Sequence, residues 1–307
     1  MPYVALATLG HEARLAAAGT RWDALLAARP DLGPAVALQR DLLLIVADLA
    51  RTLEHGRLPK LSLPPKYLAA KLAHGTPALA GEPIPVPVPV LTPGVGRLCD
   101  ALERGGAGEA AAHIRASLDE TRLDTGSLLA ASLKRDQAAI WTGATHRGLS
   151  PDLLWLVAEL AVSPFVHALQ EVLVGRAQTP EMKAAFDSWT SGSCPFCGSW
   201  PALAEVAATH RALRCSFCAL AWELNTYACV YCGEQGEPFV TAAPNIERKD
   251  RRLELCKSCG GYLKAVDVPA LSVFPLLPIA DLETMDLDMA AMERGFGRPA
   301  LRDFTKR

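Results

Sequence analysis

Cys194-Pro195-Phe196-Cys197 opens the stretch on which the fold depends, because it is the first of four Cys-x-x-Cys pairs. We call each pair a claw, since a tight turn between two cysteines places both sulfurs on one side of the backbone. Two facing claws supply the four thiolates of a tetrahedral metal site. The sequence therefore predicts two bound metal ions. Their expected ligands are Cys194, Cys197, Cys215, Cys218, Cys229, Cys232, Cys256 and Cys259.

The residue after each claw is also informative. Glycine stands there at Gly198, Gly233 and Gly260, whereas Ala219 follows the second claw. Glycine adopts the left-handed backbone conformation at little cost, so we expect a turn of that kind at the end of each claw. The simplest pairing is sequential, with the first two claws on one metal and the last two on the other. An interleaved pairing stays open, because spacing alone does not exclude it.

Other uses of the cysteines fit the sequence less well. Disulfides in a secreted domain would need an export signal, and Met1-Pro2-Tyr3-Val4 shows no basic segment followed by an apolar core. A disulfide across Cys-x-x-Cys also closes too small a loop to stabilise much. A thioredoxin-like site would use one such pair rather than four. Cys99 stands alone in an Ala/Leu-rich stretch and is expected to be a buried small hydrophobe.

Charge argues against nucleic-acid binding. The formal net charge is −2 with neutral thiols, and eight thiolates with two divalent metals make the cysteine region more acidic. A basic cluster at Arg248, Lys249, Arg251 and Arg252 is interrupted by acidic residues. We therefore expect a solvated loop there rather than a surface that binds the phosphates of a nucleic acid.

The longest apolar run, residues 153–174, contains Glu159, Pro164 and His167. These side chains would be costly in hydrocarbon, so we expect no membrane span. The run instead predicts a helix pair broken or kinked at Pro164. Reduced thiols that bind metal favour a cytoplasmic protein.

The sequence pattern changes at Thr190–Ser193. Before this point, apolar residues recur at three- and four-residue steps, which predicts a helical domain. After it, short apolar stretches separate the claws, which predicts two small rubredoxin-like or zinc-ribbon β modules and then a C-terminal helix. The predicted fold class is α+β. The predicted limits are 1–190 for the α-helical domain, 191–227 and 228–270 for the first and second four-cysteine metal ribbons, and 271–307 for a C-terminal extension.

Individual elements can be predicted from the same patterns. Residues 82–90 carry proline at every second position, which predicts an extended strap. The expected helices cover residues 12–28, 34–54, 65–74, 96–118, 125–145, a run from 151, and 180–189. The expected strands cover residues 200–207, 211–215, 219–227, 239–242, 252–255 and 262–268.

At its claws the chain resembles the FdhE family of accessory proteins for formate dehydrogenase maturation. The resemblance is carried by residues 194–201, 211–218, 229–233 and 256–264, and by Asp281-Leu282 and Gly295-Phe296 in the tail. It covers about residues 190–300, and over the helical part it concerns only length and character. Thr226 departs from the pattern, because an arginine is expected shortly before the third claw.

The resemblance implies a non-catalytic cytoplasmic accessory factor. Its implied partner is the catalytic subunit of respiratory formate dehydrogenase, bound before export of that subunit by the twin-arginine route. The resemblance also implies iron in rubredoxin-like sites, although four thiolates suit zinc equally well. A second copy of the chain is a further candidate partner.

Other functions were weighed from the residues themselves. Four thiolates leave no open coordination position for water, so hydrolytic metal catalysis is not expected. The seven histidines form no spaced set with acidic residues or serines. The alternative function is a rubredoxin-type one-electron carrier, and a zinc-ribbon nucleic-acid-binding protein is less favoured.

Overall fold

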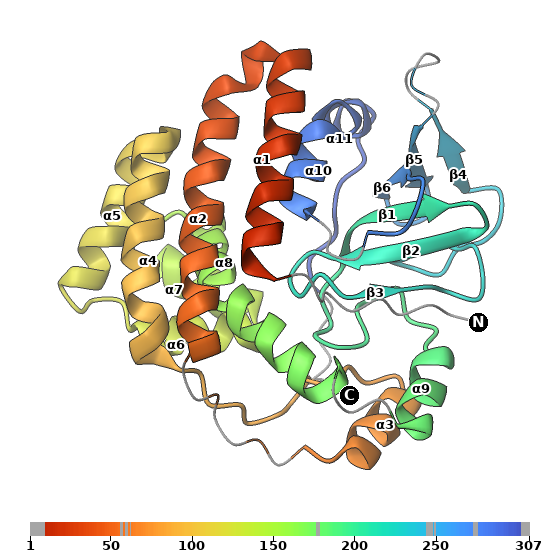
Figure 1. Cartoon of the computed structure of the whole chain (residues 1–307), viewed down its shortest axis with the longest axis horizontal. Helices are drawn as coiled ribbons and strands as arrows, with labels where there is room; N and C mark the ends of the chain where they lie inside the picture. The colour runs from red at the N-terminus through yellow and green to blue at the C-terminus, as the bar shows by residue number, and fades with distance from the viewer. Residues whose placement is uncertain are drawn as a thin grey trace. The chain divides into compact units, whose positions relative to one another are not determined.

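The chain forms two compact units, which we call the helical unit and the cysteine unit (Figure 1). The computed structural model describes residues 10–55, 58, 61, 63–175, 179–243, 248, 250–272 and 276–301. Within these, the helical unit comprises the described residues of His11–Ser62 and Gly81–Val172. The cysteine unit comprises Gly10, Leu63–Ala80 and the described residues from Leu173 onward. The start of the chain and Lys249, both used in the sequence predictions, lie outside the described residues.

The helical unit is built around α8 (Pro151–Gln170), which packs against most of the other helices of this unit. One face of α8 is fully buried, including Val157, Ala161 and Phe165. The helices of this unit are α1 (His11–Ala28), α2 (Gly33–His55), α4 (Val88–Leu102), α5 (Gly108–Asp119), α6 (Thr125–Leu133), α7 (Gln137–His146) and α8, with short turns η1 (Pro30–Leu32) and η2 (Glu103–Ala107).

The most apolar segment of the described chain is Pro151–Gly175, which comprises α8 and the following turn η3 (Glu171–Gly175). By length and composition it could cross a membrane, but half of its most apolar window is buried inside the protein. Glu159 of α8 pairs with Arg135 at 2.8 Å. These contacts are those of a core helix.

The predicted break at Pro164 is absent, because α8 runs through Pro164 as one helix. A proline inside a helix lacks the N–H that would bond to the carbonyl four residues earlier, here that of Leu160. The Ser163 hydroxyl donates to this carbonyl at 3.2 Å and so provides a substitute partner. The helix therefore tolerates the proline.

The cysteine unit contains one six-stranded sheet of order β3-β2-β1-β6-β5-β4. All neighbours are antiparallel except β1 and β6, which are parallel. The predicted α+β class is confirmed, and the two predicted modules each supply three strands to a shared sheet. The strands are β1 (Pro201–Ala207), β2 (His210–Cys215), β3 (Ala221–Trp222), β4 (Phe239–Ala242), β5 (Arg251–Cys256) and β6 (Gly261–Asp267).

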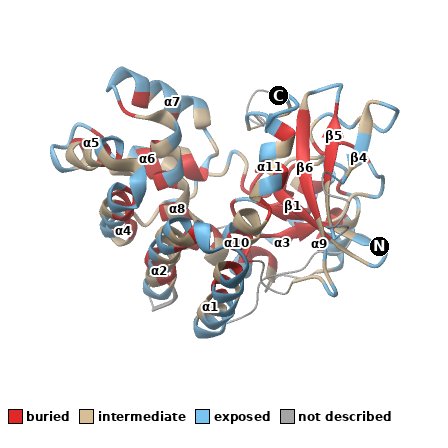
Figure 2. Cartoon of the chain, turned by 90° about the horizontal axis from the view of Figure 1, so that it is seen from above, coloured by how far each residue is buried: buried red, intermediate tan, exposed pale blue. Residues whose placement is uncertain are grey.

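The two halves of the sheet repeat one order of elements: claw, strand, strand, claw, strand. In the first half these strands are β1, β2 and β3, and in the second half they are β4, β5 and β6. The parallel pairing of β1 with β6 joins the halves, with Leu203 opposite Lys264. Figure 2 shows β1, β5 and β6 largely in the colour of buried residues.

In the described part of the cysteine unit, four helices accompany the sheet. α3 (Pro65–Ala73) packs against α9 (Pro180–Asp187), whose N-terminus is capped by the Thr179 side chain. α10 (Leu277–Glu283) contacts β1, and α11 (Met285–Met292) contacts β5 and β6. The expected C-terminal helix is therefore present as two short helices. The predicted domain limits at residues 190, 227 and 270 stay a prediction.

Candidate metal centre

Both groups of claws lie at the same end of the sheet. β2 ends at Cys215 and β5 ends at Cys256. β2 and β5 run in the same direction, because they are the antiparallel partners of the parallel strands β1 and β6. The first residues of β1 and β4 pair with Cys215 and Cys256 respectively. The topology therefore brings the first and third claws beside the second and fourth.

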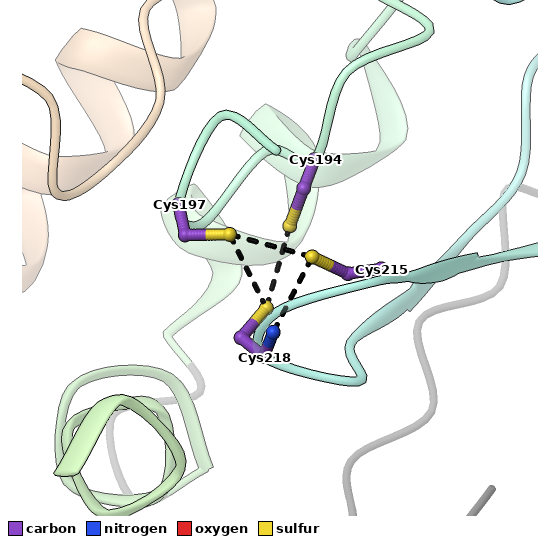
Figure 3. A group of neighbouring side chains, drawn as sticks. All are labelled: Cys194, Cys197, Cys215 and Cys218. Atoms are coloured by element: carbon purple, nitrogen blue, oxygen red, sulfur yellow. Dashed lines mark hydrogen bonds between the residues drawn. The ribbon is translucent and has the colours of Figure 1, made fainter. Parts of the chain in front are cut away.

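The first cluster consists of Cys194, Cys197, Cys215 and Cys218, whose side chains converge from the loop before β1 and from the end of β2 with the turn that follows it (Figure 3). Sulfur–sulfur distances are 3.5 Å for Cys194–Cys218, 3.4 Å for Cys197–Cys215 and 3.6 Å for Cys197–Cys218. A tetrahedral site with metal–sulfur bonds of about 2.3 Å has sulfur–sulfur edges of about 3.8 Å. The cluster therefore has nearly the dimensions of a tetrathiolate site.

The first cluster is enclosed by protein. All four of its cysteines are buried, as are Phe196 and Phe217 inside its claws. Backbone N–H groups of Phe217 and Cys218 donate to the Cys215 sulfur at 3.4 Å. Burial, with neighbouring sulfurs adding to it, raises the pKa of the Cys194 and Cys218 thiols well above the ordinary value. A cation bound by all four cysteines would have to compensate the negative charges of four buried thiolates.

The second cluster consists of Cys229, Cys232, Cys256 and Cys259. Sulfur–sulfur distances are 3.7 Å for Cys229–Cys259 and 3.6 Å for Cys232–Cys256. Cys232 and Cys259 are exposed, whereas Cys229 and Cys256 are buried. The two clusters thus share a geometry and differ in their access to solvent.

The second cluster also differs in its pKa values. Burial raises the pKa of the Cys229 and Cys259 thiols. At Cys256 burial acts in the same direction, but backbone N–H groups of Cys259 and Ser258 and the neighbouring thiols outweigh it. The pKa of Cys256 consequently lies below its ordinary value of 9.0. The lowered pKa favours the thiolate form of Cys256, which is the form that binds a metal ion.

All four claws end in the same turn. The residues that follow them have φ values of 80° at Gly198, 60° at Ala219, 81° at Gly233 and 69° at Gly260. In each claw the N–H of this residue donates to the carbonyl of the first cysteine, at 2.8–3.2 Å. The predicted left-handed turn is confirmed at every claw, including the one that ends in alanine.

The grouping of the cysteines is sequential. Sulfurs within each cluster all lie within 4.8 Å of one another. In the described residues, the first two claws form one cluster and the last two form the other, as in the sequential pairing and unlike the interleaved one. A four-sulfur donor set suits zinc or iron, and the cysteine sulfurs alone fill a tetrahedron. That these eight residues hold two metal ions stays a prediction.

Other residues singled out from the sequence lie away from the clusters. Cys99 is fully buried, and burial raises the pKa of its thiol to about 12, as expected for a small core residue. Arg248 pairs with Asp250, and Arg252 pairs with Asp267. These described members of the basic cluster are therefore neutralised locally.

A cavity that the sequence did not predict lies beside the second cluster. Its volume is about 650 Å³, and Cys229, Cys232, Trp200 and Tyr231 contribute to its lining. The Trp200 and Tyr231 rings meet edge to face with centroids 5.2 Å apart. The only sequence signal was an aromatic residue near each of two claws, and the pairing of these residues depends on the fold.

Comparison with known proteins gives consistent relatives. No family model matches the chain. The chain is 29% identical over 276 residues to the protein FdhE homolog of Pseudomonas aeruginosa, covering 84% of this chain and 81% of that protein. It is 25% identical over 170 residues to the FdhE homolog of Aquifex aeolicus, covering 53% of this chain and 56% of that protein. With an FdhE homolog of Haemophilus influenzae the match is 31% over 116 residues, 36% of this chain and only 37% of that protein.

The fold resembles a solved structure over most of both chains. The crystal structure of the FdhE protein from Pseudomonas aeruginosa superimposes with a TM-score of 0.58 and covers 93% of each chain. Sequence identity in this superposition is 24%, so the likeness is one of fold.

Proposed function

We propose that this chain, which is similar to FdhE proteins along most of its length, acts as a non-catalytic accessory factor in the assembly of respiratory formate dehydrogenase. In this proposal it is cytoplasmic and binds the catalytic subunit of that enzyme before the subunit is exported. Each of its two cysteine clusters holds one metal ion. The resemblance favours iron, and zinc fits the same donors.

The observation that carries this proposal is the combination of a match along most of the chain with two four-sulfur clusters at the motifs of the family. A cation held by four thiolates has no vacant position for a water or a substrate. The cysteines can therefore shape a binding surface, and their geometry does not suggest a hydrolytic site. This supports a role in recognising another protein.

Deletion of the gene tests the proposal. We expect respiratory formate dehydrogenase activity to be lost in the deletion strain and restored by the wild-type chain. The purified chain should also form a stable complex with the catalytic subunit, measured by size-exclusion chromatography of the two purified proteins. A deletion strain with undiminished formate dehydrogenase activity would contradict the proposal.

A rubredoxin-type electron carrier is the second candidate, and the exposure of residues Cys232 and Cys259 favours it. An electron-transfer site needs an edge that a redox partner can approach, and the second cluster offers one. This role requires iron, which absorbs visible light in a tetrathiolate site, whereas zinc has no redox chemistry. A colourless protein that contains two zinc ions would exclude this function.

A further inference from the structure

The two clusters differ in how far protein covers their sulfurs. The first is sealed at every position, since Cys194 and Cys215 are 0% exposed, Cys218 is 1% and Cys197 is 5%. In the second, Cys232 and Cys259 are exposed. These two residues come from different claws, so each half of the second site has one cysteine that is exposed to solvent.

The cover of the first cluster comes from distant parts of the cysteine unit. The N–H groups of Ala78 and Leu79 donate to the carbonyls of Pro195 and Phe196, both at 2.9 Å. The segment after α3 is thereby fixed against the first claw. On the other flank, the indole N–H of Trp189 donates to the carbonyl of Ser193 at 2.9 Å. Access to the first cluster therefore requires local opening of these contacts.

Distant segments also bond to the second cluster, where the N–H of Gly297 donates to the carbonyl of Gly260 at 2.9 Å, but they leave Cys232 and Cys259 exposed. The cavity of about 650 Å³ lies directly against its third claw and is lined by Cys229 and Cys232. Hydroxyl and amide side chains of Thr226 and Gln235 line it as well. Among the described residues of its lining, none has a charged side chain. The lining consists of Thr190, Ser191, Gly192, Trp200, Leu224, Thr226, Ala228, Cys229, Val230, Tyr231, Cys232, Gly233, Gln235 and Ala300.

We infer that the second cluster exchanges its ligands and its metal with external soft donors, chiefly small thiols, while the first cluster retains its metal. The exchange takes place at Cys232 and Cys259. This inference rests on the proposed function only in requiring that both clusters hold a metal ion.

The chemistry of the exchange needs no other reagent. An incoming thiol forms a new metal–sulfur bond as its thiolate, the bond to the Cys232 sulfur breaks, and the proton of the thiol passes to Cys232. The metal keeps its charge and no electron moves. A second thiol replaces Cys259 in the same way, which leaves only the two buried sulfurs, Cys229 and Cys256, as protein ligands. A chelator can then remove the ion.

The protein allows this exchange without losing its fold. Cys232 and Cys259 are each the second cysteine of a claw, whereas Cys256 is the last residue of β5. The third and fourth claws are also held together by the Ser258 hydroxyl, which donates to Glu234 at 3.0 Å. Release of two exposed sulfurs thus leaves the strand pairing of β5 intact. At the first cluster every sulfur is packed, so ligand exchange there depends on local unfolding.

The experiment uses the purified full chain with its zinc content set to two ions per chain and checked by native mass spectrometry. The chain is mixed with the chromogenic chelator pyridylazoresorcinol at increasing glutathione concentrations. We expect two phases of equal amplitude, with the first at least about tenfold faster than the second. The rate of the first phase should rise with glutathione, and that of the second should not.

Iodoacetamide added after the first phase identifies the cluster that has opened. We expect peptide mass spectrometry to find the label on Cys232 and Cys259, while the cysteines of the first cluster remain unlabelled. A one-zinc species should be the intermediate. Release of both ions in one phase, or earlier labelling of Cys194 or Cys218, would overturn the inference.

A substitution tests the route of access. Trp200→Ala removes an aromatic wall of the cavity and its contact with Tyr231. We expect the rate of the first phase to rise by about threefold or more, because glutathione reaches the second cluster more easily and the barrier to ligand exchange there falls. The rate of the second phase should not change, because access to the first cluster is unaltered. Trp200 lies three residues after Cys197 of the first claw, so a general loosening of this region would accelerate the second phase as well. Trp141→Ala, at a tryptophan that is 44% exposed in the helical unit, is the matched control and should change neither phase.

The outcomes separate the two proposals. Two zinc ions that leave together would refute the inference and leave the accessory function standing. Full formate dehydrogenase activity in a deletion strain would refute the accessory function, while biphasic release would still support unequal clusters. If the chain bound no zinc at all, the inference would be refuted, because it requires a metal ion in both clusters.

Discussion

At the scale of single residues, the backbone turn after each claw is what allows two cysteines to face one cation. The sequence revealed this turn because glycine is the residue that most easily takes positive φ, and three of the four positions are glycine. Ala219 adopts the same conformation with φ of 60°, so the turn is required even where the residue disfavours it. The claw motif thus determines local geometry strongly enough to be read from sequence.

Gly233→Ala tests this requirement. A Cβ atom at Gly233 would meet no atom within 4 Å, so the only cost is the left-handed conformation itself. We expect the free energy of unfolding of the metal-loaded chain to fall by about 1 kcal/mol, measured by urea denaturation. Gly297→Ala, where φ is not positive and a Cβ atom likewise meets no atom within 4 Å, is the control and should change this free energy by less than about 0.5 kcal/mol. Equal effects of the two substitutions would show that the turn is not strained.

The unequal exposure of the eight cysteines could not be predicted from their spacing. Exposure depends on which distant segments cover each claw, such as Ala78 and Leu79 against the first claw. The four claws look equivalent as motifs, yet the fold buries every cysteine of the first two claws and leaves one cysteine exposed in each of the last two. The sequence therefore predicted which cysteines are candidate metal ligands, but it did not predict which of them are exposed to solvent.

At the scale of elements, most helices and strands were predicted. The strand expected over residues 219–227 is wrong in length, since β3 covers only Ala221–Trp222, and the errors among the helices lie at breaks. A single helix was expected over residues 96–118, but Gly106 with φ of 113° and Gly108 with φ of 44° divide it into α4 and α5. Likewise Arg135, with φ of 58°, ends α6, and the Asp136 side chain caps α7. Apolar periodicity continues across such breaks, so periodicity alone does not reveal them.

The proline-rich segment was predicted only in part. Residues 82–87 are irregular as expected, but α4 begins at Val88 with proline in its first turn. Proline at the first helical positions is favourable, because the N–H groups there have no partner within the helix. The alternating prolines therefore lead into a helix instead of continuing as a strap.

One ionic cluster attaches the C-terminal helices to the sheet. Lys264 of β6 is fully buried and lies 2.6 Å from both Asp281 and Asp288. The Tyr262 hydroxyl donates to Asp288 at 2.8 Å. Burial acts to raise the pKa of Asp281, but Lys264 and Arg298 outweigh it and hold that pKa below the ordinary value of 3.8. The contribution of Asp281 to stability is therefore present at neutral pH and is lost as pH falls through its lowered pKa.

Lys264→Ala tests this attachment. Removal of the ammonium leaves two carboxylates close together without their buried partner, and both keep some access to water. We expect the free energy of unfolding to fall by about 2 kcal/mol and α10 and α11 to lose protection against hydrogen exchange. Lys183→Ala, at an exposed lysine of α9 in the same unit, should cost less than about 0.5 kcal/mol. Unchanged protection of α10 and α11 would show that other contacts hold them.

At the scale of the whole molecule, the cysteine unit joins two similar modules through one shared sheet. The individual strands and the α+β class were predictable, because each short apolar stretch lies between two claws. The parallel pairing of β1 with β6 was not, since it joins residues far apart in sequence, such as Leu203 and Lys264. The same holds for Leu63–Ala80, which packs with the cysteine unit although it precedes most of the helical unit in sequence.

The central claim is that the chain holds two metal ions, each in a cluster of two successive claws. Native mass spectrometry of the chain purified under reducing conditions tests it most directly. The wild-type chain should carry two ions. Cys194→Ser and Cys218→Ser should each carry one, and the double variant should still carry one, because both cysteines serve the same ion. Adding Cys229→Ser to Cys194→Ser should remove both ions. A wild-type chain without bound metal, or a Cys194→Ser Cys218→Ser variant that loses both ions, would contradict the account.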